Sequence, residues 1–228
     1  MAVAENTPCP PVTEHARQNV ELSPCWRSHG LRTAKRLVDL IGAGALLVLL
    51  SPLFFVLAMA VKLTSPGPIF YRWKVVGCGG KPFTGYKFRS MCANADQLKA
   101  ELENRNEMTG PVFKVTNDPR VTKLGAWMRR YSLDELPQFY SVLKGDMSLV
   151  GPRPPLVTEY ERFTDFQKQK LSVKPGITCL WQVSGRNKVN DFDEWVRLDL
   201  EYIRTWSLKL DFNILLRTVG AVTSGSGK

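Results

Sequence analysis

The chain has 228 residues, which suffice for one ordinary domain with a buried core and leave little for a second. Its 31 lysines and arginines exceed its 21 acidic residues, and the net charge of +10 favours anionic partners such as phosphorylated ligands, nucleic acid or an anionic membrane surface. The two histidines lie within the first 30 residues and no CxxC pair occurs, which excludes most histidine-dependent catalysis and gives no indication of a zinc site. Catalytic groups are then expected among carboxylates, lysines and tyrosines.

The N-terminal part of the sequence divides into a polar stretch and an apolar one. Residues 1–31 have no apolar periodicity and are rich in proline, serine and charged residues, so we predict a disordered tail. Within the next segment, 32–64, the 22 residues from Leu40 to Val61 carry no charge. A helix of that length measures about 33 Å, close to the hydrocarbon thickness of a bilayer. We predict a membrane segment, since the alternative, a buried core helix, is usually shorter and has a polar face.

Ser51-Pro52 lies at the middle of this segment, where proline removes a backbone hydrogen bond and bends a helix. Basic residues flank both ends, so the positive-inside rule selects no direction for a spanning helix. They are Arg32, Lys35 and Arg36 before the uncharged run and Lys62, Arg72 and Lys74 after it. We expect a re-entrant helix-break-helix with both ends on the cytoplasmic side, and a kinked spanning helix stays open as the alternative.

A small cytoplasmic catalytic domain is expected over residues 65–220, followed by a flexible tail at 221–228. Two predicted strands, Ile69–Val75 and Pro82–Arg89, are joined by the glycine-rich turn 77–80 into a short β-hairpin. Helical patterns follow at 94–105, 119–130, 136–144, 156–171 and 191–204. The predicted fold class is therefore α+β and mostly helical.

The most informative stretch is RRYSLDELPQ, residues 129–138, in which two arginines precede the adjacent carboxylates Asp134 and Glu135. Two interpretations stay open. Ser132 and Glu135 have the spacing of a capping box, in which the glutamate only satisfies a backbone amide at a helix start. Alternatively, the helix dipole and the arginines favour an ionised Asp134, which is a competent nucleophile toward phosphorus, and the arginines hold phosphate oxygens.

Two later loops combine rigid backbone with basic side chains. KGDMSLVGPRPP (144–155) places Arg153 between prolines, and the stretch 174–187 places Arg186 after KPGIT and Trp181. Glycine permits close backbone approach to a ligand, and proline reduces the entropy lost when a loop binds. A purely structural turn is the alternative for both loops, and a lone tryptophan such as Trp181 is more often part of a core than a base-stacking platform.

Five motifs that follow the Ser-Pro-containing segment resemble the bacterial sugar transferase family, the monotopic phosphoglycosyl transferases. They are KFRSM (87–91), NDPRVTKLGAWMRRYSLDELPQ (117–138), KGDMSLVGPRP (144–154), KPGIT (174–178) and WQVSGRN (181–187). The resemblance runs from about Arg32 to Arg217. One departure is Cys179, where the family usually has glycine, and this residue could tighten the loop or merely fill it.

The resemblance implies a re-entrant segment in the bacterial inner (cytoplasmic) membrane, bent at Ser51-Pro52, with the catalytic domain on the cytoplasmic face. It implies ping-pong transfer of a sugar 1-phosphate from a UDP-sugar to undecaprenyl phosphate, in which Asp134 forms a covalent phosphosugar intermediate and UMP is released. Magnesium is the expected cofactor, with Glu135 as its ligand and as the second catalytic residue. The implied substrate-binding residues are Lys87 and Arg89 on the strand side, Arg129 for the lipid phosphate, and Arg153 and Arg186 for the diphosphate.

The insertion at residues 103–117 resembles family members that start exopolysaccharide or O-antigen chains with glucose or galactose 1-phosphate. UDP-glucose or UDP-galactose is therefore the expected donor, for the first membrane step of exopolysaccharide, capsule or O-antigen synthesis. Two functions of other classes compete with this one: a membrane-anchored protein that binds nucleic acid or anionic lipid, motivated by the net charge, and a non-catalytic scaffold for glycan assembly. We expect membrane lipid, but no nucleic acid, as a partner.

Overall fold

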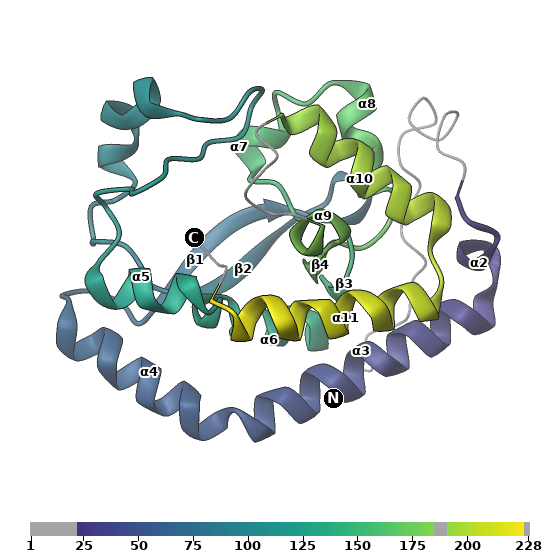
Figure 1. The fold of residues 1–228 in the computed structure, drawn as a ribbon, viewed down its shortest axis with the longest axis horizontal. Coiled ribbons are helices and arrows are strands. Elements are labelled where there is room, and N and C mark those ends of the chain that lie inside the picture. Colours follow the sequence, from purple (N-terminus) through teal and green to yellow (C-terminus); the bar gives the residue numbers. More distant parts are fainter. Residues whose placement is uncertain (1–21, 185–190, 226–228) are drawn as a thin grey trace.

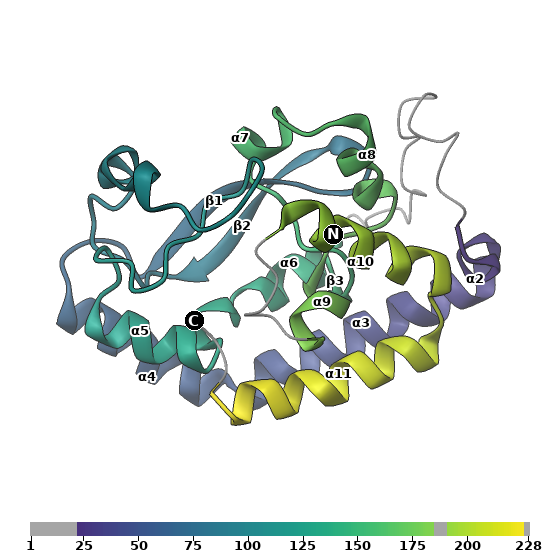
Figure 2. The ribbon, with the colours of Figure 1, turned by 45° about the horizontal axis from the view of Figure 1, so that its top comes forward.

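The structure is a computed structural model that describes residues 22–184 and 191–225 (Figure 1). Arg186, one of the predicted site residues, lies outside these ranges. Most of the described chain is helical, with two small two-stranded sheets, which confirms the predicted α+β class. The long helices α3 (His29–Leu49) and α4 (Ser51–Thr64) run along the base of the molecule, and the hairpin and the loops of the site lie above them (Figures 1 and 2).

Helices α3 and α4 meet at an angle of 62°. The break lies at Leu50, directly before Ser51-Pro52, because Pro52 has no N–H to continue the hydrogen-bond ladder of α3. Ser51 Oγ donates to the carbonyl of Val48 at 2.8 Å. Among the described residues no single helix is long and apolar enough to cross a membrane, but this bent pair meets that test by length and composition when its two helices are taken together.

The predicted boundary of the N-terminal tail at residue 31 is wrong for residues 22–31. Helix α2 (Pro24–Arg27) precedes α3, and Ser28 caps α3 by accepting from the N–H of Leu31. The ring of Trp26 stacks on that of Trp206, with the ring centroids 4.0 Å apart, and its Nε1 donates to Ile203 O at 3.0 Å. These contacts with a distant part of the chain hold residues 22–28 in place, although their sequence has no apolar periodicity.

Strands β1 (Phe70–Val76) and β2 (Pro82–Phe88) pair antiparallel, with Phe70 opposite Phe88 and Val76 opposite Pro82. The predicted hairpin is confirmed, and each strand end lies within one residue of its predicted place. The turn η1 (Cys78–Gly80) requires its glycines, because Gly79 and Gly80 have positive φ angles of 69° and 80°.

Three predicted helices are confirmed: the first two begin later than predicted, and the third is shifted by one residue at each end. These are α5 (Lys123–Arg130), α6 (Gln138–Lys144) and α10 (Phe192–Thr205). Helix α5 begins four residues later than predicted because Thr122 caps it, accepting from the N–H of Gly125 at 2.9 Å.

Two predicted helices are wrong in type or in continuity. Residues 94–105 contain the 3-10 helix η2 (Gln97–Arg105), in which only Leu102 is buried, so no apolar face holds a full α-helix. Residues 156–171 break into short pieces because Thr164 and Gln167 form a capping box that starts a new helix. These pieces are α7 (Val157–Tyr160), α8 (Asp165–Lys168) and η4 (Gln169–Ser172).

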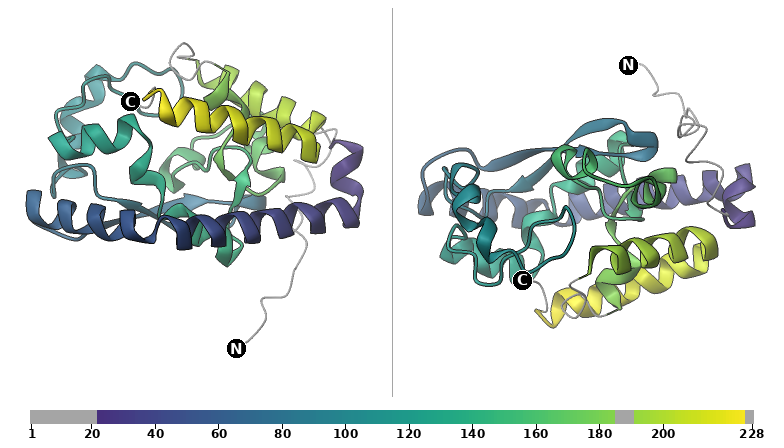
Figure 3. Two further views of the ribbon diagram at one scale, coloured as in Figure 1. Left: turned by 60° about the horizontal axis from the view of Figure 1, so that its bottom comes forward. Right: turned by 90° about the horizontal axis from the view of Figure 1, so that it is seen from above.

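The C-terminal half adds elements that the sequence did not predict. Strands β3 (Ser148–Val150) and β4 (Gly176–Thr178) pair in parallel, and α9 (Leu180–Val183) and α11 (Leu208–Thr223) follow. Since α11 extends to Thr223, the predicted tail is wrong for residues 221–223. Viewed from below, α3–α4 and α11 run along two edges of the same face (Figure 3).

Two apolar cores hold these elements together. The larger one lies under β3, β4, α9 and α10 and includes Trp181 stacked on Trp195, with centroids 4.2 Å apart, which confirms the core interpretation of Trp181. The smaller one is formed by Leu57, Val61, Phe88 and Met128. The smaller core joins α4 to the hairpin and to α5, so the bent helix pair is an integral part of the fold.

Candidate active site

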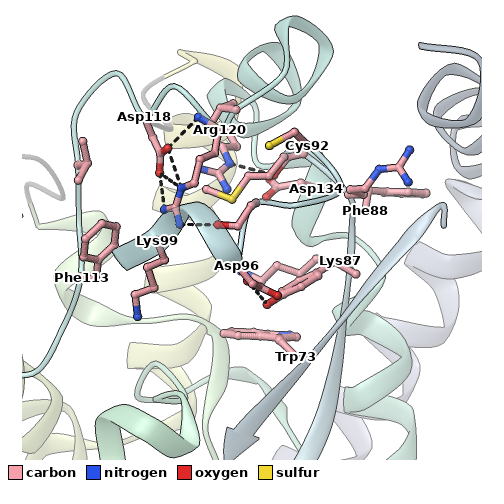
Figure 4. Close-up of a pocket in the computed structure, with 18 of the residues that line it drawn as sticks. Trp73, Lys87, Phe88, Cys92, Asp96, Lys99, Phe113, Asp118, Arg120 and Asp134 are labelled. Atoms are coloured by element: carbon pink, nitrogen blue, oxygen red, sulfur yellow. Dashed lines mark hydrogen bonds and ion pairs between the residues drawn. The ribbon is translucent and has the colours of Figure 1, made fainter. Parts of the chain in front are cut away.

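A cavity of about 930 Å³ lies between the hairpin, η2, the C-terminal half of α5 and the loop after β3. This volume is typical of sites that hold a small-molecule substrate. Figure 4 shows its interior, with the pair Asp118 and Arg120 at one side and Trp73 at the other. Five of the predicted site residues that the structure describes line it together with Asp134: Lys87, Arg89, Arg129, Glu135 and Arg153.

The two adjacent carboxylates lie in η3 (Leu133–Glu135), a single turn between α5 and α6. Ser132 precedes this turn in the left-handed region, with φ 53°, and makes no side-chain capping bond to it. The capping-box interpretation of Ser132 and Glu135 is therefore wrong. Asp134 is 7% exposed at the wall of the cavity.

Glu135 is paired with Lys87 of strand β2, whose Nζ lies 2.7 Å from Glu135 Oε1. The same ammonium lies 4.3 Å from the ring centroid of Trp73, which adds a cation–π contact on the opposite strand. Both charged side chains are mostly buried, so solvent screens this pair little. The hairpin and the turn η3 are thereby held together at the wall of the cavity.

Arg129 projects from the last turn of α5, and its Nε donates to Ser90 Oγ at 2.9 Å. Burial lowers the pKa of its guanidinium, and the negative charge of Asp134 is the largest influence that opposes this shift. An arginine nonetheless stays protonated at neutral pH. Arg129 therefore presents a permanent positive charge close to Asp134.

Arg89 is buried and binds the C-terminal end of α4. Its Nη2 donates to Ser65 O at 2.7 Å, to Ser65 Oγ at 2.8 Å and to Val61 O at 3.4 Å. A cation at a helix C-terminus is stabilised by the exposed carbonyls there. Its Nε and Nη1 have no hydrogen-bond partner among the described residues. Arg89 thus anchors the helix pair to the hairpin. This structural role was not predicted, since the sequence placed Arg89 only among the substrate-binding residues.

Sequence reasoning gave no role to the pair Asp118 and Arg120, which forms another wall. The guanidinium donates from Nε and Nη2 to the Asp118 carboxylate, with the shortest contact at 2.6 Å, and from Nη1 to Ala95 O at 3.1 Å. Its Cζ also lies 5.3 Å from the ring centroid of Phe113. Arg120 thus connects the loop that contains Asp118 to the loop that contains Ala95. The sequence DPR (118–120), with an aspartate two positions before an arginine, could have indicated this ion pair.

Cys179, the departure from the family pattern, is buried at the start of α9, where its N–H donates to Gln182 Oε1 at 3.1 Å. Burial raises the pKa of its thiol well above the usual range. The thiol is therefore protonated at neutral pH and fills the larger core without acting as a nucleophile.

No group of three or more histidine, cysteine, aspartate or glutamate residues in the described ranges could hold a metal ion on its own. Mg²⁺, however, is commonly bound by one or two carboxylates together with substrate phosphates. Glu135, which lines the cavity next to Asp134, suits that kind of site.

A family model of the bacterial sugar transferases matches residues 30–225. The chain is 50% identical over 194 residues to a galactosyl transferase, CpsE, of Streptococcus agalactiae serotype III (strain NEM316), a match that covers 85% of this chain and 43% of the relative. It is 44% identical over 200 residues to the undecaprenyl-phosphate galactose phosphotransferase of Salmonella typhimurium, a match that covers 86% of this chain and 42% of that relative. It is 43% identical over 195 residues to the UDP-glucose:undecaprenyl-phosphate glucose-1-phosphate transferase of Escherichia coli K12, a match that covers 82% of this chain and 40% of that relative. The chain spans less than half the length of these three relatives.

Proposed function

Since the chain belongs to the bacterial sugar transferase family, we propose that it transfers a sugar 1-phosphate from a UDP-sugar to undecaprenyl phosphate. The observation that carries this proposal is the place of Asp134, a carboxylate at the wall of a cavity of about 930 Å³ that is also lined by Lys87, Arg129 and Arg153. The cations attract a diphosphate, and the carboxylate supplies a nucleophile.

The proposed reaction has two half-reactions. An oxygen of Asp134 attacks the β-phosphorus of the UDP-sugar, the bond from that phosphorus to the bridging oxygen breaks, and its electron pair leaves with UMP. A phosphate oxygen of undecaprenyl phosphate then attacks the same phosphorus. The bond to Asp134 breaks, which restores the carboxylate and leaves a lipid diphosphosugar. The acceptor needs no strong base, because a phosphate monoester is already largely dianionic at neutral pH.

The residues around Asp134 have distinct proposed roles. Arg129 would hold the lipid phosphate next to the reacting phosphorus, since its positive charge interacts directly with the negative charge of Asp134. Arg153 would hold the donor diphosphate from the loop after β3. Lys87 compensates the negative charge of Glu135. Arg186, which is not among the described residues, is also proposed to contact the diphosphate.

Mg²⁺ is the proposed cofactor, with Glu135 as the residue that would hold it together with diphosphate oxygens. When bound, the ion neutralises negative charge on the diphosphate and stabilises the departing UMP. Glu135 is already the partner of Lys87, so the ammonium and a bound cation would share one carboxylate.

A position at the cytoplasmic face of the bacterial inner membrane is proposed from the exposed apolar side chains. On α3 and α4 they include Leu37, Val38, Ile41, Val48, Leu49, Phe55, Val56, Met59 and Leu63, of which Val48 and Leu63 are 76% and 77% exposed. On α11 they are Phe212, Leu216 and Val219. Apolar surface of this extent is stable against lipid and costly against water. The bent pair enters one leaflet and returns, which leaves both of its ends in the cytoplasm.

The proposed donor is UDP-glucose or UDP-galactose, since two of the relatives are named for the transfer of galactose and the third for the transfer of glucose 1-phosphate. The product would start exopolysaccharide, capsule or O-antigen synthesis. A panel of UDP-sugars, assayed for UMP release with undecaprenyl phosphate in detergent, tests the donor. Higher release from UDP-N-acetylglucosamine or UDP-N-acetylgalactosamine than from both hexose donors would contradict the donor and leave the reaction class intact.

The decisive test of the reaction is Asp134→Asn. This variant should bind membranes and fold as the wild type does, yet it should form no phosphosugar-enzyme and release no UMP, because an amide cannot act as the nucleophile. Near-normal turnover by this variant would overturn the assignment. Absence of UMP release from the wild-type chain with every donor would instead favour a non-catalytic scaffold.

A further inference from the structure

A second, smaller cavity of about 130 Å³ lies next to η3 (Leu133–Glu135), the proposed catalytic turn. It is enclosed by η3 and α6 on one side and by β4, α9 and the last turns of α11 on the other. Its lining residues are Ser132, Glu135, Leu136, Phe139, Ile177, Thr178, Gln182, Val183, Thr218, Ala221 and Val222. Glu135 lines both cavities, so the two meet at the residue next to Asp134.

Most of the polar groups in this wall are already engaged. Thr178 and Thr218 share a hydrogen bond of 2.7 Å between their Oγ1 atoms, and Thr218 also donates to Ile214 O at 2.8 Å. Gln182 Oε1 accepts from the N–H of Cys179. Hydroxyl and amide groups that are bonded within the protein need no polar ligand, so the surface behaves as more apolar than its residue types suggest. Such a lining suits hydrocarbon better than a nucleotide or a sugar.

The wall of this cavity continues into the exposed apolar face of α11. Leu216 and Val219 are 57% and 62% exposed, and Val222 follows Val219 by three positions, which makes the two neighbours on the helix surface. Leu216, Val219 and Val222 therefore form one apolar row that leads from the exposed face of α11 to the cavity.

The size of the cavity limits what it can take. A dry cavity of about 150 Å³ lined by Leu, Ile and Phe binds a molecule the size of benzene, with six carbons. An isoprene unit has five carbons. The cavity thus accommodates about one unit of a polyprenyl chain, and Glu135, the neighbour of Asp134 in the sequence, lies in its wall.

We propose that this cavity binds the first isoprene unit of the polyprenyl phosphate acceptor, so that donor and acceptor reach the catalytic turn from opposite sides. The inference rests on the proposed function. The donor enters the large cavity on the hairpin side, and the acceptor comes from the lipid face along α11. Its phosphate oxygen then attacks the phosphorus held on Asp134, the bond to Asp134 breaks, and the carboxylate is restored.

Ala221→Phe tests the proposal by filling the cavity from its α11 wall. The matched control is Gly220→Phe on the same helix turn, where an added Cβ would meet nothing within 4 Å. Three quantities are measured for each purified variant: the burst of UMP released from the UDP-sugar without acceptor, the KM for undecaprenyl phosphate, and co-flotation with phospholipid vesicles.

Ala221→Phe should keep the burst and the vesicle binding, and its KM for undecaprenyl phosphate should rise at least tenfold above that of the control, since apolar pockets discriminate a single methylene by roughly 10- to 200-fold. Equal KM values in the two variants would overturn the proposal, as would loss of vesicle binding in Ala221→Phe alone, because the cavity would then serve bulk lipid. If the phenylalanine abolishes the burst, Ala221→Leu takes its place with the same two outcomes. A wild-type chain without any burst marks a failure of the proposed function itself.

Discussion

Replacing Asp211 by asparagine should destabilise the protein strongly, because this carboxylate joins three elements inside the fold. Its Oδ2 lies 2.6 Å from Lys35 Nζ of α3 and accepts from Trp206 Nε1 at 3.1 Å, and its Oδ1 accepts from Tyr202 OH at 2.7 Å. The two charged side chains are 8% and 9% exposed. Without the carboxylate, Lys35 keeps its hydrogen bond to Val150 O but loses the compensating charge.

Breaking a buried ion pair by removing one partner costs about 3 to 5 kcal/mol. In a protein of this size each kcal/mol corresponds to roughly 2 to 4 °C in Tm, so Asp211→Asn should lower Tm by about 6 to 20 °C. Asparagine keeps one oxygen as an acceptor for Tyr202 or Trp206, which favours the lower half of that range. Thermal unfolding in one detergent, at one protein concentration and one heating rate, can be followed by far-UV circular dichroism.

The control is Asp165→Asn, whose partner Lys168 lies 3.5 Å away and whose own side chain is 87% exposed. An exposed pair contributes about 0 to 1 kcal/mol, so this variant should melt close to the wild type. The double variant Lys35→Met/Asp211→Leu should recover part of the lost stability, because it removes both buried charges together. Equal melting temperatures for Asp211→Asn and Asp165→Asn would refute the reasoning.

Three further outcomes are expected. Glu135→Gln should severely impair UMP release and flatten its dependence on Mg²⁺, and an unchanged Mg²⁺ titration would remove Glu135 as the metal ligand. Single cysteines introduced at Gly30 and Phe70 should both be shielded from an impermeant thiol reagent in intact cells and both react in inverted vesicles, whereas a segment that spans the membrane would expose one of them to the periplasm. Asp118→Asn should raise the KM for the UDP-sugar more than it lowers kcat, because it loosens the connection that Arg120 makes at the cavity wall, and a pure loss of stability at constant KM would argue against this role.

The parts of the fold that the sequence predicted correctly are those fixed by neighbours along the chain. The hairpin follows from alternation and from glycines at two positive-φ positions, and the break before Ser51-Pro52 follows from the missing N–H of proline. The sequence also singled out Asp134, through the two arginines that precede it and through the family resemblance, and Asp134 lines the cavity.

The errors arise where distant contacts decide the structure. Trp26 is ordered by Trp206, and nothing near Trp26 in the sequence signals that partner. Arg89 was expected among the substrate-binding residues and lines the cavity, but its hydrogen bonds to Ser65, 24 positions away, could not be read from the sequence around it. In the same way, the capping-box spacing of Ser132 and Glu135 was a valid local signal, yet Lys87, 48 positions away from Glu135, decided where that carboxylate lies.

These distant contacts also bear on what the bent helix pair does. Asp39 of α3 accepts from Ser148 Oγ at 3.0 Å and from the N–H of Leu149 at 2.9 Å, so α3 completes the hydrogen bonding of β3. At the other end, Val61 of α4 packs with Met128 of α5, the helix that leads into the catalytic turn. Removing the pair would leave a buried backbone amide without its partner and would uncover the apolar side of α5, both of which are costly. The helices proposed to enter the membrane therefore also shape the catalytic turn, and the geometry around Asp134 depends on their remaining folded against the domain.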